Sequence, residues 1–305
     1  MRIVVFGAGV QGTLFAVRLS LGGHEVRLVA RGSRATQLAR CGAIIEDIRS
    51  GRRWRADLAV SATLEPDCAA ELCLVTVRRE QLEGVLSILA ATQIPRFVFL
   101  VNHANGSESL YEALGRKRVV SAFPGFSGGI ENNVDHFVEI SEQATAVEAS
   151  SPDIVALFRA AGIRVRSIKD MDAWLRRHAV FITAISGALC AADCDAGKLA
   201  HDSDAVRAFV LAVREGWREL DRKQIGPAPA PLRAIFEWSP LFIATAYWSR
   251  LLASRGDDYF ARHVRRAAPE MQALGADVLS LMGQAPTPNL RHLYKAVYLA
   301  AQAGE

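Results

Sequence analysis

The sequence has few cysteines, and their arrangement disfavours a disulfide framework. They are odd in number and lie mostly in apolar stretches, which suits a reducing compartment. Two of them, Cys190 and Cys194, could share one face of a helix, but no cluster of histidines or further cysteines completes a zinc site near them. We therefore expect neither structural disulfides nor a bound metal. The five positions are Cys41, Cys68, Cys73, Cys190 and Cys194.

The sequence also lacks a strong excess of one charge and any long apolar run. The net charge of +4 is spread along the 305 residues, which disfavours nucleic acid as a partner and leaves anionic small molecules possible. No window approaches the roughly 18 uncharged apolar residues of a membrane span. The N-terminus enters an apolar run without a basic-then-apolar leader, so we expect a soluble, cytoplasmic protein.

The first 30 residues carry the most informative pattern. An apolar run (2–6) leads into the turn "GAGVQG", then a helical period (11–21) and a second apolar run (25–30). A GxGxxG motif between a strand and a helix is typical of dinucleotide binding. Its first glycine permits the tight turn, the second admits a diphosphate and the third allows close packing of helix on strand. The alternative is a plain βαβ unit. The residues expected to surround the diphosphate are Gly7, Gly9, Val10, Gln11 and Gly12.

The end of the second strand indicates which dinucleotide is bound. An NAD site usually has Asp or Glu there to hold the ribose hydroxyls, whereas this strand ends in Ala30 and Arg31, followed by Arg34. A guanidinium at this place can bind the 2′-phosphate of NADP through charge-assisted hydrogen bonds. The sequence thus favours NADP(H), the alternative being that both arginines belong to a solvated loop.

Further strand-like runs continue the alternation of strands and helices as far as residue 168. This alternation predicts a doubly wound, mainly parallel sheet, and ligands bind such sheets at the carboxyl ends of the strands. Polar residues lie at the ends of two of the predicted strands, at Thr76 and Arg78 and at Asn102 and His103. The glycine-rich segment "FPGFSGG" (123–129) is either a substrate loop or a plain connector. The predicted strands are 71–77, 96–102, 118–123, 144–150 and 163–168.

From residue 169 onward, helical periodicity dominates. We therefore predict two domains, a Rossmann-like NADP-binding domain over 1–168 and an all-helical domain over 169–305. In enzymes with two such domains, the substrate usually reacts in the cleft between the domains. Within the aromatic segment 236–248, core or dimer packing is favoured over a substrate pocket, which suggests a homodimer formed through the helical domain. The predicted helices are 170–193, 203–224, 230–254, 257–284 and 289–303.

In the order and spacing of its motifs, the chain resembles the ketopantoate reductase (2-dehydropantoate 2-reductase) family. The motifs are "GAGVQG", "VAR" ending at Arg31, "VTVR" (75–78), "NHANG" (102–106), "AWLRRHAVF" (173–181) and "GQAPTP" (283–288). The resemblance implies an NADPH-binding Rossmann domain, a helical domain and reduction of a 2-keto acid. It also implies that Asn102 contacts cofactor and substrate and that Glu270 is the best match for a substrate-binding glutamate.

The chain departs from the family at several of these positions. Arg78 replaces a lysine on the cofactor side, and Arg177 stands where the family has its catalytic lysine. Two asparagines that follow this lysine in the family are Phe181 and Ile185 here, and a substrate-binding serine near Glu270 is missing.

These replacements alter the expected chemistry. Arginine can stabilise the charge that grows on the carbonyl oxygen, but it does not release a proton near neutral pH. The candidates for the acid are His178, His103 and a bound water. Phe181 and Ile185 would line a more apolar pocket, which favours a bulkier substrate than ketopantoate.

Three functions follow, of which the first is preferred. The first is an NADPH-dependent reductase acting on a carbonyl or imine of a small, acid-like substrate more apolar than ketopantoate. The second is a genuine 2-dehydropantoate 2-reductase in which Arg177 does the work of the lysine. The third is a non-catalytic NADP(H)-binding sensor or interaction protein that has lost the acid.

Overall fold

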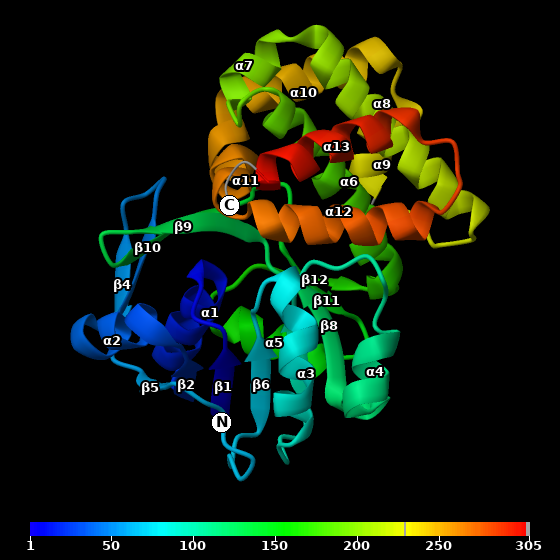
Figure 1. The fold of residues 1–305 in the computed structure, drawn as a ribbon. Helices are drawn as coiled ribbons and strands as arrows, with labels where there is room; N and C mark the ends of the chain where they lie inside the picture. The colour runs from blue at the N-terminus through cyan, green and yellow to red at the C-terminus, as the bar shows by residue number, and fades with distance from the viewer. Residues whose placement is uncertain (229, 303–305) are drawn as a thin grey trace. The chain divides into compact units, whose positions relative to one another are not determined.

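The computed structural model describes residues 1–228 and 230–302, and it divides into two compact units (Figure 1). The first unit comprises Met1–Val101 and Ser107–Met171, and the second comprises Asn102–Gly106 and Asp172–Glu305. The first is called the nucleotide-binding unit, after the function that its sequence predicts, and the second the helical unit. The short loop 102–106 therefore belongs with the helices, although it is flanked in sequence by the other unit.

An eight-stranded sheet forms the centre of the nucleotide-binding unit. Its order is β12-β11-β8-β7-β6-β1-β2-β5, and all neighbours are parallel except β11 and β8. The stretch from β5 to β8 has the strand order of dinucleotide-binding folds. The chain first adds strands on one side of β1 (β2, then β5) and then on the other side (β6, β7, β8), so the order of connection reverses between β1 and β6. The strands of this sheet are β1 (Arg2–Phe6), β2 (Glu25–Val29), β5 (Ala59–Ser61), β6 (Leu72–Val75), β7 (Phe97–Leu100), β8 (Val119–Phe123), β11 (Thr145–Glu148) and β12 (Val165–Ile168).

Alternating side chains of these strands bury both faces of the sheet. Along β1, Ile3 and Val5 pack in one core with α1 and α5, whereas Val4 packs in the other with α3 and α4. This alternation follows from the two-residue period of a strand. The helices of the unit are α1 (Val10–Leu21), α2 (Gly32–Cys41), α3 (Leu82–Ala90), α4 (Glu108–Leu114) and α5 (Pro152–Ala160), and short 3₁₀ turns lie at η1 (Arg79–Gln81) and η2 (Arg116–Arg118).

A second sheet of four strands, which was not predicted from the sequence, packs against α1. Its order is β4-β3-β10-β9, and β9 pairs with β10 through a hairpin. The hairpin turns at Asn132 and Asn133, which both adopt the positive φ that such two-residue turns require. "FPGFSGG" is thus neither a substrate loop nor a plain connector, because most of it forms β9. The strands are β3 (Ala43–Asp47), β4 (Arg53–Ala56), β9 (Phe126–Glu131) and β10 (Val134–Glu139).

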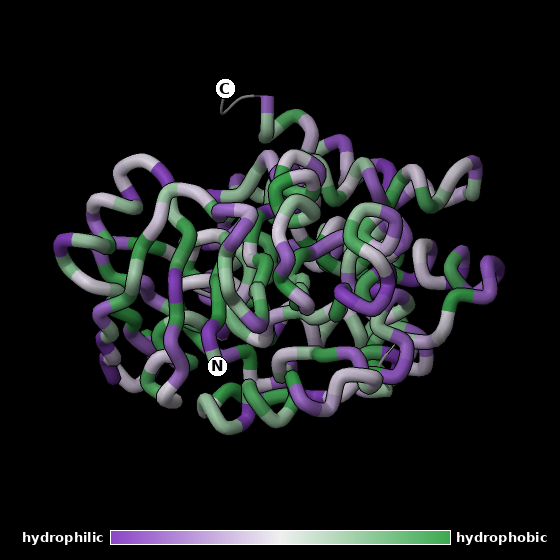
Figure 2. The backbone as a smooth tube through the Cα atoms, turned by 90° about the horizontal axis from the view of Figure 1, so that it is seen from below, coloured by the Kyte–Doolittle hydropathy of each residue, from purple (hydrophilic) through white to green (hydrophobic). Residues whose placement is uncertain are grey.

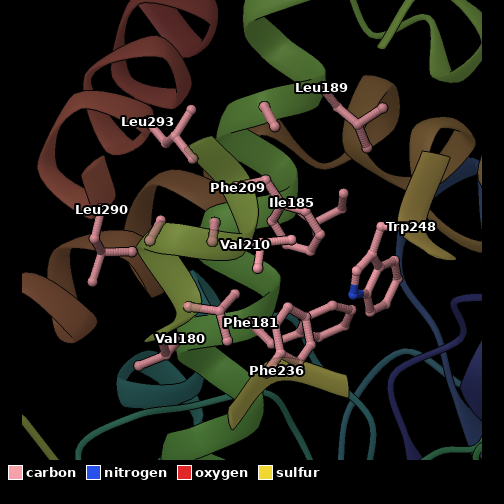
Figure 3. Packing of buried hydrophobic residues seen from close by; sticks show 14 of the residues in the cluster. Val180, Phe181, Ile185, Leu189, Phe209, Val210, Phe236, Trp248, Leu290 and Leu293 are labelled. Carbon is pink, nitrogen blue, oxygen red and sulfur yellow. The ribbon is translucent and has the colours of Figure 1, made fainter. Parts of the chain in front are cut away.

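The helical unit is built around α6, which runs from Met171 to Ala191. Figure 3 shows residues of this helix packed among apolar side chains of α8, η3, α10 and α13. The helices of the unit are α6 (Met171–Ala191), α7 (Ala196–His201), α8 (Ser203–Arg222), α9 (Ala230–Arg233), α10 (Leu241–Gly256), α11 (Arg262–Arg266), α12 (Ala268–Met282) and α13 (Pro288–Gln302), with π-helical turns at η3 (Ala234–Trp238) and η4 (Asp257–Ala261).

Two of the predicted helices are interrupted. The predicted helix 230–254 breaks at Ser239 and Pro240, since proline lacks the N–H that an uninterrupted helix needs. The predicted helix 257–284 breaks at Ala267, whose φ of −129° is not helical. Apart from these breaks, the predicted fold class is confirmed: a mainly parallel α/β domain is followed by an all-helical region.

Hydrophobic and hydrophilic residues alternate in short stretches along the chain (Figure 2). Consistent with this pattern, none of the helices among the described residues has the length and apolar character needed to cross a membrane.

Candidate functional site

The glycine turn joins β1 to α1, as the motif predicts. Gly7 has a φ of +115°, a value that a residue with a side chain rarely adopts. Thr76, at the end of the neighbouring strand β6, donates its hydroxyl to the carbonyl of Gly7 at 2.8 Å. Gly9 caps α1, whose first regular hydrogen bond runs from Thr13 N–H to Gly9 O at 2.9 Å. The N–H groups of Val10, Gln11 and Gly12 precede that bond, so they have no partner within the helix.

The second and third glycines of the motif have different surroundings. A Cβ added at Gly12 would lie 1.9 Å from Gly7 O, so this position tolerates no side chain. A Cβ added at Gly9 would have no atom within 4 Å, so the space in front of it is open. Open space before unpaired N–H groups at a helix N-terminus fits an anionic group such as a diphosphate.

The two arginines after β2 lie in different environments. Arg31 caps α2 and is exposed, and none of the described residues forms a hydrogen bond or ion pair with its guanidinium. Arg34 is largely buried, and each of its three guanidinium nitrogens donates at least one hydrogen bond. It donates to Ala8 O at 2.9 Å, to Thr13 Oγ1 at 2.8 Å and to Asp135 Oδ2 at 2.6 Å. Only Arg31 is therefore available to a ligand without breaking existing bonds.

Arg78 also lies close in sequence to the carboxyl end of β6. Its side chain is exposed, and its backbone N–H donates to the Gln81 side chain at 3.2 Å. Of the cofactor residues that the sequence predicts, those in the nucleotide-binding unit all lie on the turn after β1, after β2 or after β6. These are neighbouring strands of the sheet.

The loop 102–106 brings Asn102 and His103 into the helical unit. Both side chains are buried, and Ala104 packs in the core of that unit. Asn105 donates its amide to Asp277 on α12 at 2.9 Å, which fixes the loop against that helix. The Oδ1 atom of Asn102 is buried and has no hydrogen-bond partner within the described chain. A buried acceptor of this kind is costly unless a ligand or water completes it.

Arg177 is buried and surrounded by acceptors. Its guanidinium donates to Gly226 O at 2.6 Å, Ile225 O at 2.9 Å and Trp217 O at 3.3 Å. It also bonds Asp221 at 2.5 Å and lies 3.7 Å from Glu237. These contacts connect α6 to α8, to the segment after α8 and to η3. All three guanidinium nitrogens are thus committed to the protein itself.

Phe181 and Ile185 lie in the core of the helical unit. Phe181 contacts Phe209, Phe236 and Trp248 with ring centroids 5.4–6.0 Å apart, and Ile185 is fully buried (Figure 3). The expectation that these two residues line a substrate pocket is therefore not met. Burying large apolar side chains against one another is the better account of their identity.

His178 stacks on Trp174 at 4.8 Å and is buried. Burial lowers the pKa of its imidazole to about 3, because the charged form loses its hydration. The ring is therefore neutral at pH 7 and does not carry the proton expected of a general acid.

Glu270, in the first turn of α12, is buried next to His263. Oε2 of Glu270 and Nε2 of His263 are 3.6 Å apart. Glu270 was predicted from the sequence, but His263 was not. The only signal in the sequence was the separation of seven residues between them, from α11 to α12.

Sequence reasoning also missed three buried polar residues. Asp135 on β10 faces Arg34, and Thr183 and Ser186 on α6 interrupt an otherwise apolar helix. Ser186 Oγ lies 3.1 Å from the sulfur of Met271, the neighbour of Glu270. The motif "ITAIS" contained the signal for the last two, since two hydroxyls occur within an apolar run.

The helical unit contains a separate cavity of about 450 Å³. Its lining comes from the α6–α7 turn, the end of α10 with the start of η4, and α11, and it includes Asp193, Asp195, Arg255 and Arg265. None of the site residues predicted from the sequence lines it. Over the residues that the structure describes, no group of three or more His, Cys, Asp or Glu side chains is arranged to hold a metal ion.

Comparison with known proteins relates the chain to ketopantoate reductases. Residues 3–143 match the family described as Ketopantoate reductase PanE/ApbA. A 2-dehydropantoate 2-reductase from Archaeoglobus fulgidus is 25% identical over 189 residues, which cover 61% of this chain and 62% of that protein. The match thus spans less than two thirds of the relative's length. The resemblance indicated by the motifs is confirmed.

Solved structures extend the likeness in fold to the whole chain. D-mandelate dehydrogenase with NADH and anilino(oxo)acetate has a TM-score of 0.79 at 16% identity, with 99% of both chains covered. A PanE/ApbA family ketopantoate reductase from Ralstonia eutropha has a TM-score of 0.78 at 17% identity and the same coverage. A dimeric ketopantoate reductase from Staphylococcus aureus has a TM-score of 0.71 at 12% identity, with both chains fully covered. Identities this low show the fold alone.

Proposed function

We propose that this chain, related to ketopantoate reductases, is an NADPH-dependent reductase of a small 2-oxo acid more apolar than ketopantoate, or of the corresponding imine. The observation that carries the proposal is the glycine turn, with open space at Gly9 and unpaired N–H groups behind it. A neutral ligand would leave those groups poorly satisfied, whereas a diphosphate matches them in charge and hydrogen bonding.

The choice of NADPH over NADH rests on Arg31. This side chain is exposed and uncommitted at the end of β2, where an NAD site usually has a carboxylate. Arg78, exposed after β6, is the second cation proposed for the cofactor. Arg34 is not proposed to contact the 2′-phosphate, because its donors are already bonded within the protein.

A bound nicotinamide would supply the hydride, and the protein must stabilise the oxygen charge and provide a proton. Asn102 is proposed to hydrogen bond cofactor and substrate, because its buried Oδ1 has no partner in the protein. Glu270 is proposed to bind the substrate. We propose that Arg177 positions α6 and has no contact with substrate, since its donors are already used. With His178 neutral, His103 and a bound water are the proposed proton sources.

The substrate class is inferred from D-mandelate dehydrogenase, whose structure contains the aromatic oxo acid derivative anilino(oxo)acetate. Phe181 and Ile185 no longer support it, because they belong to the core. An aromatic 2-oxo acid such as phenylglyoxylate is therefore the first compound to try.

Cofactor choice is tested by titrating NADPH and NADH against the wild type and two variants. Arg31→Ala should weaken NADPH binding about tenfold or more and leave NADH binding nearly unchanged, since one charge-assisted contact is lost. Arg40→Ala, on the exposed end of the same helix, is the matched control. Tighter binding of NADH than of NADPH by the wild type would rule out the role of Arg31.

Substrate is tested by following NADPH oxidation with phenylglyoxylate, ketopantoate and a panel of oxo acids and imines. Efficient turnover of ketopantoate would favour a genuine 2-dehydropantoate 2-reductase. Tight NADPH binding without turnover of any compound would favour a non-catalytic sensor.

The proposed role of Asn102 predicts a loss of activity without a loss of stability. Asn102→Ala should lower kcat/KM by about tenfold to a hundredfold, as expected for a lost hydrogen bond of 1–3 kcal/mol. It should not lower the melting temperature, because the protein leaves Oδ1 unsatisfied. A matched loss of both would instead indicate a structural asparagine.

We also propose a homodimer formed through the helical unit. The aromatic segment 236–248 contributes Phe236 and Trp248 to the core but leaves Trp238 62% exposed and Phe242 74% exposed. Large exposed apolar side chains close together in sequence fit an interface better than a free surface. The related enzyme from Staphylococcus aureus is dimeric. The five free cysteines agree with a cytoplasmic location, which we also propose.

A further inference from the structure

Beneath the glycine turn, a buried ion pair joins three elements of the nucleotide-binding unit. Arg34 lies on α2 and Asp135 on β10, and Arg34 also reaches the turn and the first turn of α1. The side chain of Asp135 is 1% exposed, and that of Arg34 is 16% exposed. Burying two charges costs free energy of desolvation that their attraction barely repays. A contribution to stability is therefore a poor explanation for this ion pair.

The contacts of Arg34 are directed at the ligand-binding turn. Its Nε donates to the carbonyl of Ala8, which lies between Gly7 and Gly9. One terminal nitrogen is shared between Thr13 and Asp135, and the other donates to Gln37 at 2.5 Å. Holding the Ala8 carbonyl on the protein side fixes the peptide plane that leads into Gly9.

Asp135 in turn determines where Arg34 points. A guanidinium has several rotamers, and on an exposed loop it would turn toward a nearby phosphate. The carboxylate of Asp135 neutralises it and holds it below the turn at 2.6 Å. A second connection between the same elements supports this arrangement, since Gln37 also donates to Asn133 O at 3.2 Å.

We propose that Asp135 and Arg34 are positioning residues that fix the glycine turn for a dinucleotide, and that neither discriminates between NADPH and NADH. This inference rests on the proposed function, because it assumes that the turn binds a dinucleotide. It assigns a purpose to the small sheet, which brings Asp135 under the turn. It also separates the two arginines after β2, since Arg31 reads the 2′-phosphate and Arg34 does not.

The test compares the affinities for NADPH and NADH, measured by fluorescence titration at pH 7.5. Asp135→Asn and Arg34→Met should each weaken both cofactors by about tenfold and leave the ratio of the two affinities within about twofold of the wild type. Glu139→Gln is the control, because Glu139 lies on the same strand and pairs with Arg164 at 2.9 Å, away from the turn. It should change neither affinity.

A double variant guards against simple misfolding. Arg34→Met combined with Asp135→Leu removes both charges, so the melting temperature should recover toward that of the wild type. If the pair positions the turn, affinity for both cofactors stays about tenfold low despite this recovery. Recovery of affinity together with stability would overturn the proposal.

The pH dependence of NADH binding gives a second readout, and NADH avoids the 2′-phosphate, whose pKa of about 6 would confuse the result. The charged or titratable groups near Asp135 are Arg34 on α2, His136 on β10 and Glu46 on β3, and the last two pair with each other at 3.8 Å. NADH affinity should fall about severalfold between pH 7.5 and pH 5 in the wild type and in His136→Gln, but not in Asp135→Asn. An unchanged fall in Asp135→Asn would count against the pair.

The remaining outcomes separate this inference from the proposed function. If the wild type binds neither cofactor, both are wrong. If the wild type binds NADPH and the two single variants match it, only the positioning role is wrong. If Arg34→Met weakens NADPH alone, Arg34 contacts the 2′-phosphate and the proposal fails while the cofactor assignment stands.

Discussion

At the residue scale, the guanidinium of Arg177 meets the carbonyls of Trp217, Ile225 and Gly226 and the carboxylate of Asp221. A lysine has a single nitrogen and cannot reach so many acceptors at once. The arginine therefore suits a structural contact between α6 and the segment after α8.

Arg177→Met should lower the free energy of unfolding by about 2–4 kcal/mol, because several buried carbonyls lose a charged donor. Asp221→Asn should cost under about 1 kcal/mol, since Asp221 is itself mostly exposed. Urea denaturation measures both. If Arg177→Met kept its stability but lost all turnover, Arg177 would be catalytic after all.

At the element scale, the turn between β1 and α1 separates two kinds of glycine. Gly12→Ala should destabilise the protein by about 1–3 kcal/mol, because the added methyl would overlap Gly7 O. Gly9→Ala should leave stability nearly unchanged, since its backbone is extended and the space around it is open. It should instead weaken dinucleotide binding, because the methyl occupies the space expected for the diphosphate.

Thermal melts followed by circular dichroism, together with cofactor titration, test this pair of variants. Gly84→Ala, at an open position on α3, is the control for glycine replacement in general. The prediction fails if Gly9→Ala binds NADPH as tightly as the wild type.

The elements also show what the sequence could predict. The parallel strands are short, continuous apolar runs, so β1, β6, β7 and β8 were recognisable from composition alone. The small sheet was not, because β9 is rich in glycine and β4 is rich in arginine, and both gain their structure from packing on α1.

The candidate site divides in the same way. The glycine turn has a local signature, whereas the bonds of Arg34 and Arg177 depend on residues 101 and 44 positions away. Arg177, Phe181 and Ile185 are four residues apart and so lie on one face of α6, but this spacing alone does not reveal that the face packs into the core.

At the scale of the whole molecule, each unit has one buried titratable group, and the pKa values of the two groups are shifted in opposite directions. Burial lowers the pKa of His178 from 6.5 to about 3. Between these pH values the unfolded chain therefore binds a proton at this residue, and the folded helical unit does not. Burial raises the pKa of Asp135 to about 6, against the opposing charge of Arg34, so the folded nucleotide-binding unit is protonated first. Between pH 6 and 4, acid therefore weakens one unit and stabilises the other.

The variants His178→Phe and Asp135→Asn should shift this balance in opposite directions. His178→Phe should reduce the loss of unfolding free energy between pH 6.5 and 4.5, by up to about 1.4 kcal/mol per pH unit. Asp135→Asn should increase that loss, because it removes a compensating gain. Urea titrations at both pH values decide, with the exposed His292→Asn as control. Equal pH slopes in all four proteins would contradict the assignment.

The proposed dimer is also a property of the whole molecule. Phe242→Glu should convert a dimer to a monomer in sedimentation experiments, since a carboxylate would be buried in the interface. Leu21→Glu, at an exposed apolar position in the nucleotide-binding unit, should leave the mass unchanged. A monomeric wild type would remove the basis for this surface.

The loop 102–106 has a consequence for the time course of synthesis. It leaves the ribosome with the sheet, yet the helices against which Ala104 packs come only after residue 171. At about 5–20 residues per second, roughly 10–30 seconds pass between synthesis of the loop and synthesis of α12. A nascent chain can therefore complete its glycine turn before α6 and α12 have been made, and the loop 102–106 acquires its packing partners only afterwards.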